Sequence, residues 1–89
     1  MADNVVIFPR DGEGFYADVT VEDHRLRLFS TISAATAGWA GHVYDLKATQ
    51  WVAQGLLSHD VEQGKARARE IAEALVHQEL LELEWKACP

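Results

Sequence analysis

The chain has 89 residues, enough for one domain, and its 14 acidic and 8 basic residues give a net charge of −6. Apolar residues make up 48% and charged residues 25%, which is typical of a globular protein and excludes a disordered one. An acidic chain without a basic face is a poor nucleic-acid binder, and no apolar run approaches the ~20 residues needed to cross a bilayer. We therefore expect neither a nucleic-acid nor a membrane partner.

The cysteine content and the first residues indicate the cellular compartment in which the protein is expected. A single cysteine, Cys88, excludes an internal disulfide bond. The first residues lack the basic start and the apolar stretch of a signal peptide. We therefore expect a cytoplasmic protein, a single domain over residues 1–89.

The first half of the chain predicts a β-meander over residues 15–57, preceded by an N-terminal arm or edge strand at residues 1–10. Residues 15–21 and 25–32 alternate between apolar and polar side chains around a polar turn, which predicts a β-hairpin. On this pattern the core takes one side of each strand and the residues between them point away. The inward set is Phe15, Val19, Leu26 and Leu28, and the outward set includes Tyr16 and Phe29.

Two further strands follow, over residues 39–46 and 50–57. The first carries bulky apolar residues on both of its sides, so its inward face stays open between Trp39 with Val43 and His42 with Tyr44. In the second, strict alternation places Trp51 on the core side and turns Val52 and Leu56 away from it.

Residues 58–78 predict one long helix, because their apolar and small residues recur at helical spacing. Ser58 is the expected N-cap, and Asp60 with Gln63 forms a competing cap. The small residues Gly64, Ala68 and Ala72 lie on one stripe. We expect them to bring the helix close to the sheet and to leave room for large rings, supplied by Trp51 or Trp39 together with Trp85.

Near Gln78 the hydrophobic period changes from that of a helix to strict alternation. Leu81, Leu83 and Trp85 alternate with polar residues, which predicts a C-terminal strand over residues 81–87. A helix that continues to Lys86 is the alternative, since no glycine or proline separates the two segments. The expected fold is α+β: one mainly antiparallel sheet of four to five strands packed on one long helix, in the order β-β-β-β-α-β.

The sequence contains no recognisable catalytic or cofactor motif. Glu73 and His77 share a helix face, but such a pair is far more often an ionic contact than a metal site. His42 reads as a hydrogen-bonded core histidine. We therefore expect no catalytic residue, no cofactor and no metal, and a protein that is not an enzyme.

The surplus of apolar residues predicts an interface. A single helix covers one face of the sheet, and an apolar patch left on the other face marks a site of interaction. We expect a small protein-interaction module that forms a homodimer. Its candidate interface or ligand face consists of Tyr16, Phe29, Trp39, Val43, Tyr44, Val52 and Leu56.

Other occupants and functions stay open. The apolar run at residues 5–8 could fold over the patch, or another protein could bind it. A second hypothesis is an acidic inhibitor or nucleic-acid mimic, of the phage or mobile-element type, that blocks a basic partner. A third is a module for a small aromatic or cationic ligand, with Trp39, Trp51 or Tyr44 as a stacking wall.

Overall fold

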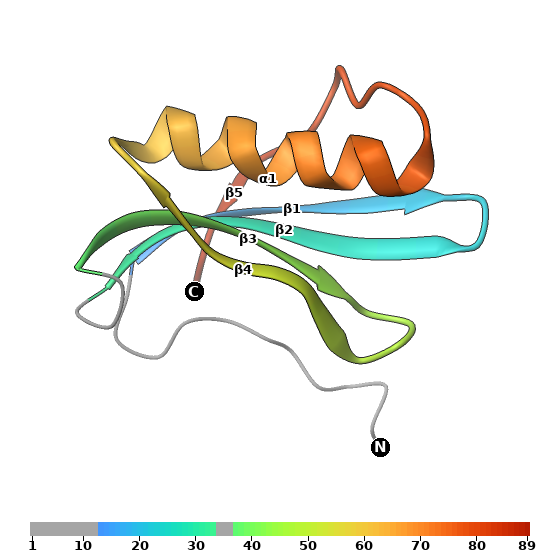
Figure 1. Cartoon of the computed structure of the whole chain (residues 1–89), viewed down its shortest axis with the longest axis horizontal. Coiled ribbons are helices and arrows are strands. Elements are labelled where there is room, and N and C mark those ends of the chain that lie inside the picture. Colours follow the sequence, from blue (N-terminus) through green and yellow to red (C-terminus); the bar gives the residue numbers. More distant parts are fainter. Residues whose placement is uncertain (1–12, 34–36) are drawn as a thin grey trace.

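The computed structural model describes residues 13–33 and 37–89, and it confirms the α+β fold with the order β-β-β-β-α-β. One antiparallel sheet of five strands carries one helix across a single face (Figure 1). The expected arm at residues 1–10 lies outside the described residues. The elements are β1 (Glu13–Val21), β2 (His24–Ser33), β3 (Gly38–Asp45), β4 (Gln50–Ser58), α1 (Val61–Val76) and β5 (Lys86–Ala87).

The first four strands form the predicted meander, and the sheet order is β4-β3-β2-β1-β5. The β1–β2 hairpin turns at Glu22 and Asp23, and its register pairs Val19 with Leu26. The β3–β4 turn is shaped by Asp45, whose Oδ1 accepts hydrogen bonds from the backbone N–H groups of residues 47 and 48, both at 2.9 Å. Strands β4 and β5 therefore form the two edges of the sheet.

The core lies between α1 and the face of the sheet that it covers. The inward side chains predicted on β1 and β2, Val19, Leu26 and Leu28, are confirmed there. On β3, whose inward face the sequence left open, it is Val43 that enters this core. The remaining buried members come from the helix and the segment after it: Ala68, Ala72, Val76 and Leu80.

Small residues let α1 lie directly on the sheet. A Cβ atom built on Gly41 would be 2.6 Å from the carbonyl oxygen of Gly64, and one built on Gly64 would overlap the hydroxyl of Ser30. That hydroxyl donates a 2.7 Å hydrogen bond to the carbonyl of Val61. The close approach predicted for the small stripe is therefore present. Of the large rings expected opposite it, Trp51 lies on the other face of the sheet, whereas Trp85 packs against the core on the helix side. Next to Gly64 the space is filled by Ser30.

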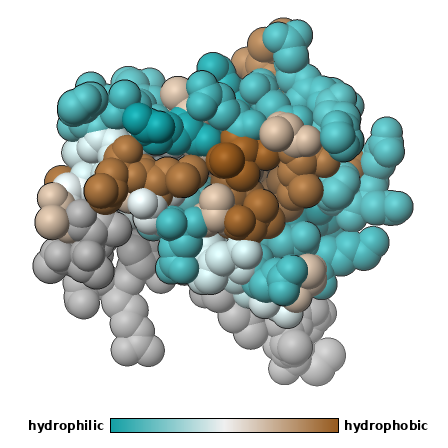
Figure 2. All heavy atoms as spheres, in the orientation of Figure 1, coloured by the Kyte–Doolittle hydropathy of each residue, from teal (hydrophilic) through white to brown (hydrophobic). Residues whose placement is uncertain are grey.

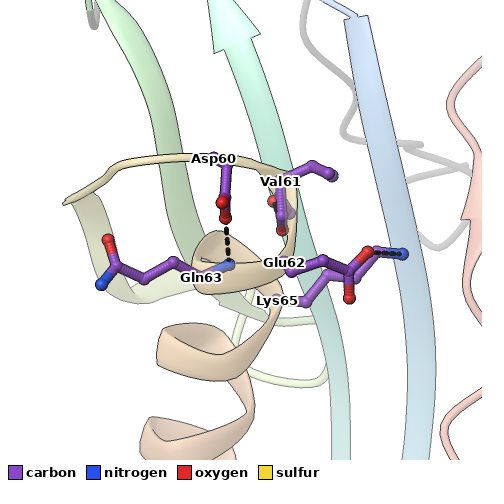
Figure 3. Close-up of polar contacts among 6 residues, drawn as sticks. Asp60, Val61, Glu62, Gln63 and Lys65 are labelled. Carbon is purple, nitrogen blue, oxygen red and sulfur yellow. Dashed lines mark hydrogen bonds and ion pairs between the residues drawn. The ribbon is translucent and has the colours of Figure 1, made fainter.

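The helix begins two residues later than the preferred prediction. Asp60 is the N-cap, and its Oδ1 accepts from the backbone N–H of Gln63 at 2.9 Å (Figure 3). The Gln63 side chain in turn accepts from the backbone N–H of His59. This is the competing cap named above. Ser58 does not cap the helix because it still belongs to β4, where its hydroxyl donates to the carbonyl of Leu56.

The helix ends near the predicted change of period, and the alternative of one continuous helix is wrong. His77 adopts the left-handed conformation (φ 58°), and its N–H bonds to the carbonyl of Glu73. The Glu73 carboxylate accepts from the backbone N–H of Leu80 at 2.8 Å, which holds the chain as it turns back. The C-terminal strand is shorter than the predicted 81–87. Only Lys86–Ala87 pair with β1, although Leu83 and Trp85 pack against the core.

Candidate interaction surface

The face of the sheet opposite α1 carries an aromatic cluster. Phe29, His42, Tyr44 and Trp51 come from β2, β3 and β4, and Trp51 lies at the centre of it. Its ring centroid is 4.9 Å from that of Tyr44, 5.8 Å from that of His42 and 5.9 Å from that of Phe29. Phe29 is only 1% exposed. The cluster therefore joins three strands into a second, smaller core.

Beside this cluster, Arg27 and Asp18 form a two-point ion pair on the same face. Arg27 Nε and Asp18 Oδ1 are 2.6 Å apart, and Arg27 Nη2 and Asp18 Oδ2 are 3.0 Å apart. The hydrogen bond to this carboxylate raises the pKa of Arg27, against the opposing effect of burial. The guanidinium also lies over the ring of Tyr16. This corner of the face is therefore polar and internally paired.

Two β-bulges shape β4. Gly41 pairs with Leu56 and Val43 with Ala53, so β4 has one more residue than β3 between these pairs. Tyr44 pairs with Trp51, which adds a second extra residue at Val52. Each extra residue reverses the alternation of side chains along the strand.

The bulges correct the faces predicted for β4. Trp51 was expected in the core under the helix, but it pairs with Tyr44 and lies on the opposite face. Leu56 was expected to point away from the helix, but it pairs with Gly41, whose Cβ direction meets α1. Strict alternation fails here because it assumes an unbroken ladder.

His42 holds the bulge nearest the middle of β4. Its Nδ1 accepts the backbone N–H of Gly55 at 2.9 Å, and its Nε2 lies 3.2 Å from the hydroxyl of Thr31. Gly55 has φ +72°, the left-handed region that suits a glycine. Burial lowers the pKa of His42. A neutral ring that accepts at Nδ1 carries its proton on Nε2, where it donates to Thr31.

The outer side of β4 is apolar and bears no charge. Trp51, Val52 and Leu57 are 37%, 39% and 67% exposed. None of the nine residues of β4 is ionisable. Figure 2 shows apolar side chains gathered in a band across this side of the molecule, beneath α1. We call Trp51, Val52, Leu56 and Leu57 the β4 surface.

The structure divides the predicted interface residues among three places. Tyr16, Phe29 and Tyr44 lie on the face opposite the helix, and Phe29 is buried there. Val43 is fully buried in the helix-side core, and Trp39 is on that same face, near the end of the sheet. Only Val52 and Leu56 belong to the β4 surface. The three residues proposed as a stacking wall are also divided, because Trp51 contacts Tyr44 while Trp39 lies across the sheet from them.

Sequence reasoning missed Leu57 and the position of Trp51. The position of Trp51 follows from the bulge at Val52, which no glycine marks. The signal that could have located Leu57 is Gly55, because a glycine inside a strand pattern often marks a bulge. With one residue added at that point, Leu57 moves to the face that holds Trp51.

A shallow pocket lies at the end of the sheet where β1, β3 and the C-terminal segment meet. Its volume is about 470 Å³, and Glu13, Phe15 and Trp39 are among the residues that line it. Cys88 also lines it, and burial raises the pKa of that thiol.

Within residues 13–33 and 37–89, no three His, Cys, Asp or Glu side chains gather closely enough to hold a metal ion. The Glu73 carboxylate instead holds the turn after α1, and its nearest cation is Arg69 at 3.9 Å. The helix in this part of the chain is not long and apolar enough to cross a membrane.

No protein-family model matches the chain, and no curated protein or solved structure is significantly similar to it.

Proposed function

We propose that this chain is a small, non-enzymatic protein-interaction module of the cytoplasm that acts as a homodimer, and that the β4 surface is its interface. The observation that supports the proposal is the exposure of three large apolar side chains, Trp51, Val52 and Leu57, along one edge strand. Contiguous apolar side chains on the surface of a small domain mark a site of association.

The charge distribution favours a second copy as the partner. Two chains that each carry a net charge of −6 repel one another wherever their carboxylates meet. β4 has no ionisable side chain, so it is a surface on which two copies can approach without that cost. The same lack of charge favours an apolar partner over the basic one that an acidic inhibitor would require.

The bulges indicate the mode of contact. They interrupt the regular spacing of N–H and C=O groups that another strand would need for a long ladder. We therefore propose that the copies pack by side chains across a two-fold axis, with Leu57 and Trp51 of each copy buried by the other.

Light scattering after size exclusion tests this proposal. At micromolar concentration the wild-type chain is expected to have about twice the monomer mass of 9.9 kDa. Leu57→Glu places a carboxylate from each copy in the interface and is expected to give the monomer mass. The matched control is Leu81→Glu, because Leu81 is also an exposed leucine (75%) but lies beyond the helix, and this variant should remain a dimer. A monomeric wild type, or a dimeric Leu57→Glu variant, would overturn the assignment.

A second candidate is the binding of a small organic cation in the pocket at the end of the sheet. The presence of two aromatic residues, Phe15 and Trp39, and of Glu13 in its lining supports it, since ring faces and carboxylates both attract cations. Choline is a suitable probe. Titration should shift the indole N–H resonance of Trp39 and leave that of Trp51 unchanged, and no shift at Trp39 would dismiss this candidate.

A further inference from the structure

We propose that His42 is a pH-dependent clamp on the β4 surface: the neutral imidazole fixes the bulge at Gly55, and protonation of the ring releases that bulge and dissociates the homodimer. This inference rests on the proposed function, since it concerns regulation of the same surface.

The clamp follows from the chemistry of the two ring nitrogens. Nδ1 of His42 accepts the Gly55 N–H at 2.9 Å, so it must be free of a proton. A protonated ring donates at both nitrogens. Its Nδ1–H would then face the Gly55 N–H across the same short distance, and the hydrogen bond to β4 would be replaced by a repulsion.

Nothing nearby in the described residues stabilises the charged ring. The ring lies between Phe29 and Trp51, with centroid distances of 6.5 and 5.8 Å. The ionisable groups on this face are Tyr16 and Asp18 on β1, Arg25 and Arg27 on β2, and Tyr44 on β3. The one carboxylate among them, that of Asp18, is paired with the guanidinium of Arg27. β4 offers no ionisable group. Burial, with no opposing charge, is consequently the cause of the low pKa of His42.

The position of the clamp connects it to association. Gln54 and Gly55, which lie opposite His42, separate Trp51 and Val52 from Leu56 and Leu57 within the β4 surface. If the bulge opens, the two halves of the surface lose their fixed spacing. The dimer requires the closed form, so protonation and dissociation are coupled.

The sign of the effect follows from the lowered pKa. The closed form is complete above the ordinary histidine value of 6.5 and weakens as the pH falls below it, because the open form takes up the proton more readily. The dimer dissociation constant is therefore expected to rise on the order of tenfold between about pH 7.5 and about pH 5.

The test measures association and the Gly55 amide together. Sedimentation equilibrium at the two pH values gives the dissociation constant, and ¹⁵N NMR gives hydrogen-exchange protection at Gly55. Exchange is compared after correction for its intrinsic pH dependence. In the wild type, acidification should weaken the dimer and remove protection at Gly55. His42→Asn keeps an acceptor where Nδ1 lies but does not titrate, so both quantities should become independent of pH. His59→Asn changes an exposed histidine just beyond β4 and should retain the wild-type response.

The dissociation constant and the Gly55 protection test the homodimer and the His42 clamp separately. A dimer of unchanged affinity with Gly55 protected at both pH values would overturn the clamp and leave the homodimer standing. A second outcome is that the protein is a monomer at both pH values, while acidification removes protection at Gly55 in the wild type but not in His42→Asn. That outcome would overturn the homodimer and retain the effect of His42 on β4. A His42→Asn variant that still responds to pH would overturn the clamp. If that variant fails to fold, the wild-type Gly55 measurement decides, since unchanged protection excludes the clamp.

Discussion

Gly41 of β3 and Gly64 of α1 meet backbone to backbone, because a Cβ atom on Gly41 would lie 2.6 Å from the Gly64 carbonyl oxygen. Main-chain atoms cannot rotate away from a new methyl group as the end of a long side chain can. The distance between helix and sheet is therefore set at this point.

Gly41→Ala is expected to destabilise the fold by about 1–3 kcal/mol, the usual cost of overpacking a core. Urea denaturation measures the free energy of unfolding of both proteins. An unchanged dependence of that free energy on urea concentration shows that the same unfolding reaction is compared. A change smaller than about 0.5 kcal/mol, typical of surface substitutions, would contradict the close contact.

Gly64→Ala is expected to destabilise the protein even though alanine favours a helix by about 1 kcal/mol over glycine. The new methyl group meets the hydroxyl of Ser30, which is held by its bond to the Val61 carbonyl. In a Ser30→Ala background the penalty should shrink, giving a coupling energy of at least about 0.5 kcal/mol in a double-mutant cycle. Additive effects would show that the two side chains do not compete for space.

Asp60→Ala is expected to cost about 1 kcal/mol, because it removes the acceptor for the Gln63 N–H. Ser58→Ala is the matched comparison, since the sequence offers Ser58 as an equally good cap while the structure places it in β4. It should cost less than about 0.5 kcal/mol. Thermal unfolding followed by circular dichroism distinguishes them, and equal losses would argue for a shared cap.

Lys65 ties the C-terminal segment to β1. Its ammonium lies 4.7 Å from the centroid of Phe15 and 5.5 Å from that of Trp85. Lys65→Met should destabilise the fold by about 0.5–1 kcal/mol and alter tryptophan emission, whereas Lys65→Arg should retain most of the contact. Glu62→Gln removes the exposed ion pair to Lys65 and the negative charge in the first turn of α1, and both are exposed contributions that should have little effect. Similar losses from Lys65→Met and Glu62→Gln would assign the stability to the ion pair.

Cys88 is expected to react slowly as a thiol. Burial raises its pKa, and the nearby positive charge of Arg27 offsets part of that rise. The folded chain should therefore be alkylated by iodoacetamide more slowly than the urea-unfolded chain at about pH 8.5. For the same reason, this thiol stabilises the fold fully below its ordinary value of 9.0 and less as the pH rises above it. Equal alkylation rates in the two states would contradict the burial.

The hairpin and its inward residues could be predicted because local signals agree there. Val19, Leu26 and Leu28 alternate with polar residues on both sides of a short polar turn, so pattern and connection point to one arrangement. The faces of β4 could not be predicted by alternation, because pairing with β3 inserts residues at Val52 and near Gly55. A bulge depends on the partner strand, which a single strand's pattern does not contain.

The C-terminal segment shows a different limit. Leu83 and Trp85 face the core, while Glu82 and Glu84 are exposed, so the predicted alternation is present over residues 82–85. Leu81, which the same pattern placed on the buried side, is 75% exposed. What the pattern does not specify is a hydrogen-bonding neighbour, and only Lys86–Ala87 has one. Alternation records which side chains are buried, and strand pairing is a separate property of the backbone.

The irregular edges of the sheet also bear on how the protein avoids uncontrolled polymerisation. At one edge β4 is interrupted by bulges, and at the other β5 pairs with only Phe15 and Tyr16 of β1. The β4 edge therefore offers no long, evenly spaced row of amide and carbonyl groups on which identical chains could stack into a fibril, whereas residues 17–21 of β1 extend beyond β5 with no strand beside them on that side among the described residues. Addition of further strands at the β4 edge is thereby disfavoured. A dimer held by side-chain packing also ends at two copies, because each copy's β4 surface is then covered by the other.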